Sequence, residues 1–329
     1  MQRWTVRPDG SNWGEFGDDD QLGRLNLITP AKRRQAVAEV KEGIAFCLSL
    51  PLDLPGGDYH GLGRRPPVLR PLLREGQPKF NLRADARRTD VFCDDCADIH
   101  THFSTHWDAL SHAGSAFDAD QDGCAEFRYY NGYRAGTDIG GEGPTARALG
   151  IEKMAQACVQ GRGVMIDLFA MFGGERRLVG FDDLMRAADA TGAVIEPGDI
   201  VCLHTGQATA LLHAGRQPPR ALLEDAFCHL DGCDDRLLRW IDQSGVAAIA
   251  ADNFAVEAVP PRLVEDGKAY ERLHELCLFK LGIHLGELWR LDELNAWLRG
   301  HRRTRFMLTA APLNLPGAVG SPVTPIATV

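Results

Sequence analysis

The chain has 329 residues, 44% hydrophobic and 25% charged, which is enough to bury a core in one large domain or two small ones. Its formal net charge of −9 disfavours nucleic acid as a partner. Its N-terminus lacks the apolar core of a signal peptide, and no apolar run approaches the ~18 residues of a membrane span. We therefore expect a cytoplasmic protein that does not enter a membrane.

Cysteine usage points to a reducing compartment. The nine cysteines are odd in number and scattered, which favours free thiols over a disulfide framework. Cys93 and Cys96 have C-x-x-C spacing, but no second such pair exists to complete a zinc knuckle. A redox motif would open a helix, whereas this pair precedes an expected strand. We interpret both residues as structural or incidental.

Residues 1–28 form an N-terminal arm that we separate from a domain spanning residues 29–329. The arm is rich in Gly, Asp and Asn and has no periodic apolar face. Folded alone, it would bury little area against an ordering cost of about 1–2 kcal/mol per backbone residue. It therefore needs another surface, which is either a neighbouring subunit or its own core, with Trp13 and Phe16 as the anchors.

The next segments mix short elements with long connections. Thr29 and Pro30 form an N-cap and N1 pair that predicts a helix over 30–42, followed by a buried strand over 44–50. Residues 51–80 are rich in Pro, Gly and Arg and predict a long surface loop, either a lid or a solvated basic loop. A strand is expected over 97–108. Residues 113–147 should be a loop whose aromatics either wall a substrate pocket or pack onto the core.

From residue 148 onward the pattern alternates between helix and strand. Helices are expected near 150–160, 181–190, 234–243, 268–280 and 291–299. Strands are expected at 163–168, 200–204, 246–251, 283–285 and 305–309. Strands that alternate with helices of about ten residues predict an α/β protein. No linker divides the chain, so we expect a single α/β domain with a mixed sheet and flanking helices.

The most informative stretch is 100–112, which contains four of the eleven histidines. Side chains alternate faces along a strand, so His102, His106 and Asp108 would share one face. Imidazole and carboxylate together suit Zn(II), Mn(II) or Fe(II). His112 follows Asp108 by four residues and could reach the same metal or its water. The alternative is a set of structural histidines on a polar loop, but three ligands at this spacing favour a metal site.

Other common catalytic motifs are missing from the sequence. It contains no G-x-G-x-x-G that opens a helix after a strand and no G-x4-G-K-[ST]. The G-x-S-x-G nucleophile elbow is also absent. Dinucleotide binding, P-loop chemistry and the common serine hydrolases are therefore not indicated.

Residues 102–112 resemble the H-x-G-T-H-x-D-x-P-x-H signature of the metal-dependent cyclase family, which includes bacterial kynurenine formamidase and isatin hydrolase. Ser104 replaces the glycine and Leu110 replaces the proline, and neither position carries a ligand. Residues 197–206, 251–257 and 312–322 resemble further segments of the family. The N-terminal arm resembles the longer bacterial branch.

This resemblance implies the swivelling β/β/α fold and a set of site residues. His102, His106 and Asp108 would bind a divalent metal, Zn or Mn, and His112 would act as the general acid/base. A metal-bound water has a pKa lowered toward neutrality, and histidine titrates near neutral pH, so these roles are chemically consistent.

A second metal site is one of two readings of the late His and Glu. Asp108 could bridge two ions if His274 and Glu287 complete a second site. Otherwise His274 is a helix-surface histidine and Glu287 a strand-end carboxylate.

The implied activity is that of a metal-dependent amidohydrolase acting on a small-molecule substrate, with a C–N bond of a cyclic or aryl amide as its target. A ring cyclase or dehydratase acting on a polyketide-like substrate is the alternative, and a non-catalytic metal-binding protein is the third possibility. The resemblance also implies a homodimer or a dimer-based tetramer. In that assembly, Trp13 and Phe16 of the N-terminal arm would lie on the neighbouring subunit, near its pocket.

Overall fold

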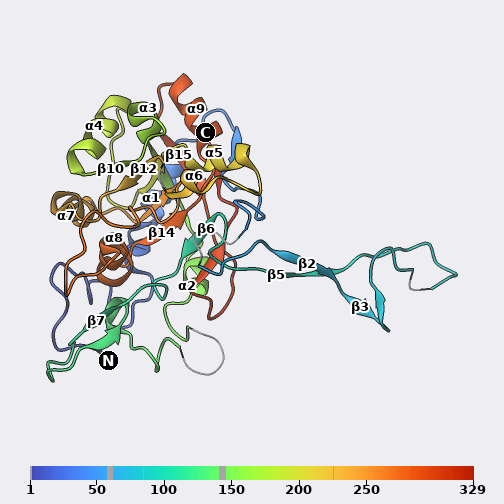
Figure 1. Ribbon diagram of the computed structural model, residues 1–329, viewed down its shortest axis with the longest axis horizontal. Helices are drawn as coiled ribbons and strands as arrows, with labels where there is room; N and C mark the ends of the chain where they lie inside the picture. Colours follow the sequence, from blue (N-terminus) through green and yellow to red (C-terminus); the bar gives the residue numbers. More distant parts are fainter. Residues whose placement is uncertain (1, 58–61, 84, 141–145, 225) are drawn as a thin grey trace.

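The structure is a computed structural model that describes residues 2–57, 62–83, 85–140, 146–224 and 226–329. A mixed nine-stranded sheet forms its centre, in the order β1-β17-β15-β9-β11-β13-β14-β6-β16 (Figure 1). These strands are β1 (Ala45–Cys47), β6 (His106–Asp108), β9 (Gln160–Asp167), β11 (Ile200–His204), β13 (Ala248–Ala251), β14 (His284–Glu287), β15 (Arg305–Thr309), β16 (Gly320–Pro322) and β17 (Ile326–Thr328). The expected single α/β domain with a mixed sheet and flanking helices is confirmed.

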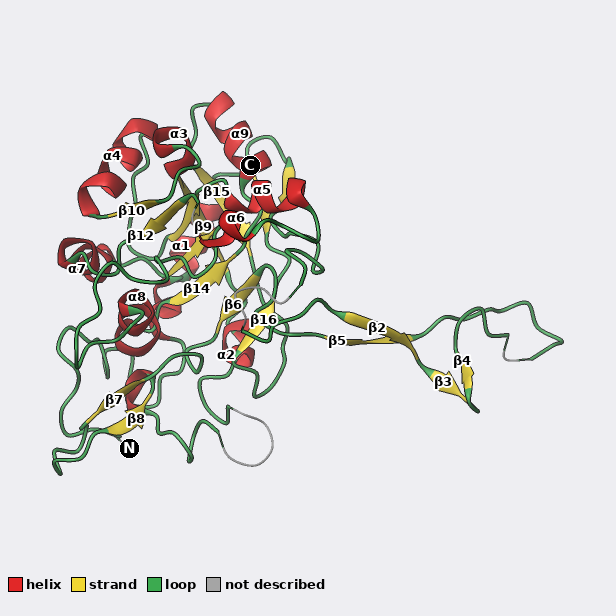
Figure 2. Ribbon diagram, in the orientation of Figure 1, coloured by secondary structure: helices red, strands yellow, loops and turns green. Residues whose placement is uncertain are grey.

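Helices surround this sheet, and short ribbons lie outside it (Figure 2). The helices are α1 (Pro30–Val37), α2 (Ile151–Gln156), α3 (Leu168–Phe172), α4 (Phe181–Thr191), α5 (Gln207–Ala214), α6 (Arg220–Glu224), α7 (Asp235–Ser244), α8 (Arg272–His274) and α9 (Asp292–Gly300), with 3₁₀ turns at Gly23–Leu27 and Tyr130–Gly132 and a π-helix at Glu275–Leu281. The ribbons pair β2 (Val68–Pro71) with β5 (Asp95–Asp98), β3 (Leu73–Arg74) with β4 (Gln77–Pro78), β7 (Ser115–Phe117) with β8 (Glu126–Arg128), and β10 (Arg177–Val179) with β12 (Cys228–Leu230).

Four neighbouring strands of the sheet, β9, β11, β13 and β14, run parallel to one another. Every residue of β11, β13 and β14 is buried, as expected for strands that are covered on both faces. Because parallel strands end at the same edge of a sheet, their last residues lie along one edge, where they bring Asp167, His204 and Glu287. The metal-site candidates gather at the β14 end of this edge.

The N-terminal arm packs on its own chain. The Trp13 indole is 1% exposed, donates a hydrogen bond to the Phe279 carbonyl at 2.8 Å, and meets the Phe279 ring edge-on with centroids 5.1 Å apart. The Arg24 guanidinium donates to the Ile241 carbonyl at 2.8 Å. The expectation that Trp13 lies on a neighbouring subunit is therefore wrong, because a groove beside the π-helix supplies the surface that the arm needs.

The segment between 113 and 147 also differs in detail from the expected loop. It contains the β7–β8 hairpin and a 3₁₀ turn. Tyr130 and Tyr133 are buried in the core, and Phe117 packs edge-on against Trp13 with centroids 6.1 Å apart. These aromatics hold the segment on the core rather than walling a pocket.

The strand expected over 97–108 is two strands separated by a turn. β5 ends at Asp98 and β6 begins at His106, so His102 is not on the strand that carries His106 and Asp108. Thr105 holds the turn, because its hydroxyl accepts from the Leu50 N–H at 2.9 Å and donates to the Leu288 carbonyl. A side chain that bonds two backbone segments in this way replaces the ladder bonds that a continuous strand would make.

Residues 51–80 do not form the expected loop, because most of them belong to a long hairpin. β2 pairs with β5, and β3 pairs with β4 beyond them, in a ribbon that extends away from the rest of the molecule (Figure 2). Cys93 and Cys96 lie on this hairpin as exposed thiols. No helix in the described ranges is long and apolar enough to cross a membrane.

The packing of the N-terminal arm predicts the effect of truncating its anchor. Trp13→Ala should lower the free energy of unfolding by about 3–5 kcal/mol, because it leaves a cavity among three aromatic rings and strands the Phe279 carbonyl. Chemical denaturation followed by circular dichroism measures this loss. The matched control is Phe127→Ala, whose ring is 72% exposed, and it should change stability by less than about 0.5 kcal/mol. Equal losses in the two variants would contradict the assignment.

Candidate metal centre

Strand β6 places two candidate ligands by simple alternation. His106 and Asp108 point to one face, while Trp107 between them points to the other and is buried in the core. The Trp107 indole donates to the Ala310 carbonyl at 2.8 Å, which fixes the strand's rotation. His106 lies directly opposite Glu287 on β14, so these two side chains meet across the ladder, with His106 Nε2 3.8 Å from Glu287 Oε2.

His102 reaches the same place from the turn before β6. Its ring lies over Gly320 of β16, where an added Cβ would come 2.2 Å from His102 Nε2. Gly320 pairs with Asp108, so the missing side chain is the space that lets His102 approach the carboxylate. His102 Nε2 is 3.4 Å from Asp108 Oδ1. We infer that any larger residue at position 320 would displace His102.

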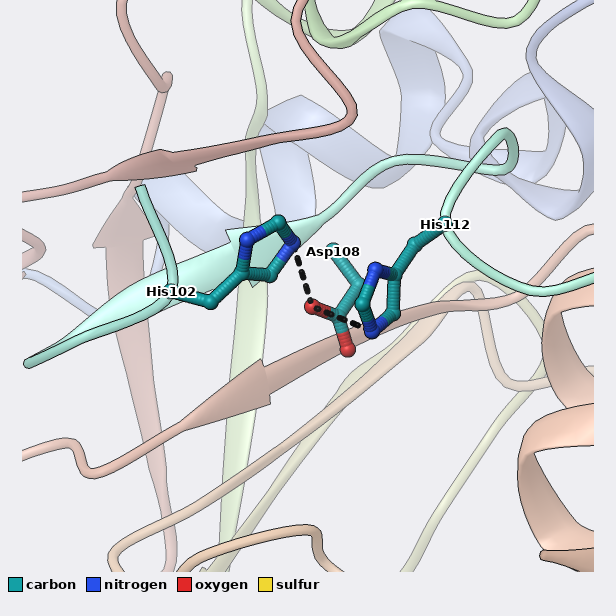
Figure 3. Close-up of side chains that lie close together, drawn as sticks. All are labelled: His102, Asp108 and His112. Atoms are coloured by element: carbon teal, nitrogen blue, oxygen red, sulfur yellow. Dashed lines mark ion pairs between the residues drawn. The ribbon is translucent and has the colours of Figure 1, made fainter. Parts of the chain in front are cut away.

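Asp108 is the common member of two groups of three side chains. One group joins His102, Asp108 and His112, and the other joins His106, Asp108 and Glu287, with the ligand atoms of each group within 4.8 Å of one another. Figure 3 shows the His102 and His112 rings approaching the same carboxylate, with His112 Nε2 3.9 Å from Asp108 Oδ1. A carboxylate shared by two groups is what a bridge between two ions requires.

Buried atoms in this cluster lack hydrogen-bond partners, which tests whether a cation fits. Within the described part of the chain, five such atoms have none: His102 Nε2, His106 Nε2, Asp108 Oδ1, Asp108 Oδ2 and Glu287 Oε2. Buried polar atoms are normally satisfied, because leaving one unpaired costs about 1–3 kcal/mol. Two imidazole nitrogens and three carboxylate oxygens facing one another form a set of donors that suits a divalent ion such as Zn(II) or Mn(II).

Neighbouring groups orient two of the imidazoles. His106 Nδ1 lies 2.7 Å from the Ser104 carbonyl, which leaves Nε2 as the atom that faces the cluster. His274 Nδ1 lies 2.7 Å from Glu257 Oε1, and its Nε2 points at Glu287 Oε1 at 3.5 Å. Glu257 also accepts from the His274 N–H at 2.8 Å, so it fixes both the ring and the start of the helix that carries it.

The electrostatics follow from burial and charge. Burial lowers the pKa of His102 well below its ordinary value, and His112 adds to the effect. Burial also opposes the charged form of Asp108, but the surrounding histidines outweigh it and lower the pKa of that carboxyl. Burial lowers the pKa of His112, with Asp108 opposing. A neutral imidazole beside a carboxylate anion is the protonation pattern that metal ligation needs.

His274 has the opposite tendency. Burial alone would lower its pKa, but the hydrogen bond to Glu257 and the nearby Glu287 carboxylate raise that pKa well above its ordinary value. As a cation, His274 would neutralise part of the acidic cluster. As a neutral ring, it would offer Nε2 to an ion beside Glu287.

The structure brings together all six residues proposed from the sequence. His102, His106, Asp108 and Glu287 are buried, and the His112 side chain is 26% exposed, so it borders the opening. His274 Nε2 lies 4.0 Å from Asp108 Oδ2 and therefore belongs to the cluster rather than to a helix surface. Their roles as metal ligands and as acid/base stay predictions.

Sequence reasoning missed two residues at this site. Glu257 was noted only in a turn, because nothing in its spacing shows that it would accept from a histidine seventeen positions later. Arg64 was read as part of a basic loop, yet its guanidinium donates to the His102 carbonyl at 3.1 Å. Together with Asp98 and His100, it lines a cavity of about 340 Å³ beside His102.

Comparisons with known proteins identify the family. The Cyclase family, described as "Putative cyclase", matches residues 48–258. A solved structure called a novel cyclase is 31% identical, with a TM-score of 0.79, over 97% of this chain and 99% of its own. Isatin hydrolase A from Labrenzia aggregata, bound to benzyl benzoate, is 15% identical, with a TM-score of 0.54, over 89% of this chain and 94% of its own.

A third structure, an isatin hydrolase bound to the product analogue thioisatinate, is 15% identical, with a TM-score of 0.54, over 92% of this chain and 98% of its own. At these identities, the isatin hydrolases show a shared fold. Among curated proteins, none matches the chain.

The unpartnered atoms predict which substitution removes metal. His106→Ala should lower the content of bound Zn or Mn at least tenfold, because it deletes a buried nitrogen that faces Asp108 and Glu287. Elemental analysis of the purified variant after dialysis measures this. His301→Ala, at an exposed position on the C-cap of α9, is the control and should bind metal as the wild type does. Full occupancy in His106→Ala would rule out this residue as a ligand.

Proposed function

This chain belongs to the Cyclase family, and from that premise we propose that it is a metal-dependent hydrolase that cleaves a C–N bond in a small cyclic or aryl amide. The observation that carries the proposal is the set of five buried, unpartnered ligand atoms centred on Asp108. The isatin hydrolases of the same fold bear the name of a cyclic amide as substrate, which supports this substrate class.

The residues divide into those that would hold the metal and those that would move protons. His102, His106 and Asp108 would hold the first ion, and Glu287 with His274 would hold a second ion that shares Asp108. A divalent ion bound there would polarise the amide carbonyl and lower the pKa of an attacking water. We leave the choice between Zn and Mn open, because this donor set accepts either.

His112 is placed to move the proton. Its Nε2 faces Asp108 Oδ1 at 3.9 Å, and its partial exposure lets a substrate reach it. Neutral imidazole can accept a proton from the attacking water and then donate it to the leaving nitrogen, so the C–O bond forms and the C–N bond breaks without a free hydroxide or amide anion. Because burial lowers its pKa, His112 would start as the free base at neutral pH.

A ring-closing cyclase or dehydratase is the second candidate. It is favoured by the name of the 31% identical structure, a novel cyclase. The same cluster could polarise a carbonyl for ring closure with loss of water. The two functions differ in whether water is consumed or released, so one isotope experiment separates them.

The test incubates the metal-loaded protein with isatin, N-formylkynurenine and a simple lactam in ¹⁸O-water. Hydrolysis predicts a ring-opened or deformylated product that carries one ¹⁸O atom, detected by mass spectrometry. Turnover should disappear after treatment with a chelator and return when Zn or Mn is added. Absence of turnover of all three amides under both metals would contradict the amide assignment.

His112→Ala should separate chemistry from metal binding. We expect it to keep the metal and to lose rate by roughly 10²–10⁴, the usual size of a general acid/base contribution. Rate and elemental content are measured on the same preparation, with His301→Ala as the control. Metal content that falls together with the rate would make His112 a ligand instead, which its membership in the group with His102 and Asp108 also permits.

A further inference from the structure

The long hairpin has no protein cover in the single chain. We define the hairpin arm as residues 62–98, of which all but residue 84 are described. It projects from the body as a narrow ribbon (Figures 1 and 2). Every residue of β2 and β5 is exposed, so both faces of the ribbon are bare. An isolated two-stranded ribbon is at best marginally stable in water, and its open edges are ready to pair or pack.

The hairpin arm concentrates exposed apolar surface. Of the twenty large apolar side chains that are exposed in the described part of the chain, eight lie in this one segment. They are Leu62, Val68, Leu69, Leu72, Leu73, Phe80, Val91 and Phe92, each 43% to 68% exposed. Side chains of this size and exposure present on the order of 700 Å² of apolar surface, more than the largest patch of about 300–600 Å² on a typical monomer.

The charge of the hairpin arm is opposite to that of the body. Eight Lys and Arg residues face six Asp and Glu residues in 62–98, giving a net charge of +2, while the remaining chain carries −11 of the total of −9. Arg70 and Arg74 make no ion pair with any described residue, although both are exposed. A basic, apolar arm is therefore complementary to the acidic body of this same chain.

We propose that the hairpin arm docks on the body of a second copy of this chain. In a two-fold dimer, each body would receive the arm of the other, so both arms are covered and the assembly closes. A standard interface takes about 800 Å² from each partner, which matches the surface that one arm presents once its polar atoms are added to the apolar ones. This inference does not depend on the proposed reaction.

The first test is the mass in solution. Light scattering of the full chain should give twice the monomer mass of 36.1 kDa. Leu69→Asp combined with Leu73→Asp, at side chains 68% and 67% exposed, should raise the dimer dissociation constant at least about 100-fold, because it places two charges in an apolar contact. Val37→Asp combined with Val194→Asp, 55% and 59% exposed on the body, is the matched control and should leave the dimer intact.

Hydrogen exchange shows whether the arm itself is covered. Amides of residues 68–71 and 95–98 should exchange at least tenfold faster in the Leu69→Asp, Leu73→Asp variant than in the wild type. Circular dichroism and thermal melting of each variant check that the body stays folded, since the substituted positions make no core contact. A wild-type monomer, an arm variant that stays dimeric, or a control that dissociates equally would each overturn the proposal. Equal exchange in the two proteins would overturn it as well.

Discussion

The structure depends on holding the Asp108 carboxylate in a fully buried position. Burying an anion is expensive unless it is compensated, and the compensation here comes from three rings, His102, His106 and His112, each with a nitrogen within 4 Å of the carboxylate. Gly320 makes room for the first ring, and the β6–β14 ladder brings the second. A cluster with acceptors and neutral imidazoles but few hydrogen bonds is organised for a cation rather than for its own stability.

The edge of the parallel strands extends this organisation beyond the metal centre. Asp252, just past β13, accepts from the Thr205 and Gly206 N–H groups at 2.6 and 2.8 Å, which fixes the turn after β11. At the end of β9, Asp167 lies 2.9 Å from His204 Nδ1; burial raises its pKa, but this histidine outweighs burial and lowers it to about 2. These carboxylates are consumed by hydrogen bonds, whereas both oxygens of Asp108 are not. That contrast separates structural carboxylates from a metal-ligating one on the same edge.

Sequence reasoning succeeded where local pattern and tertiary contact agree. The strands at 200–204 and 305–309 were predicted to the residue, because they are buried, short and bounded by turn residues. The metal cluster was predicted because four of its members lie within 102–112. The geometry that gathers them was not, since it rests on the Thr105 turn and on the space at Gly320. Such contacts join segments that no local spacing connects.

The two projecting segments show where an argument from area needs a structure. Residues 1–28 lack a periodic apolar face and need another surface, yet one indole, Trp13, anchored in its own core meets that need. Residues 62–98 have prolines and arginines that favour a solvated loop, but their apolar residues end on a bare ribbon. The requirement for a partner surface was sound, and it applies to the second segment. Because this ribbon begins at Arg64 and ends at Asp98, beside the cavity at His102, a docked arm would also fix one wall of the metal centre.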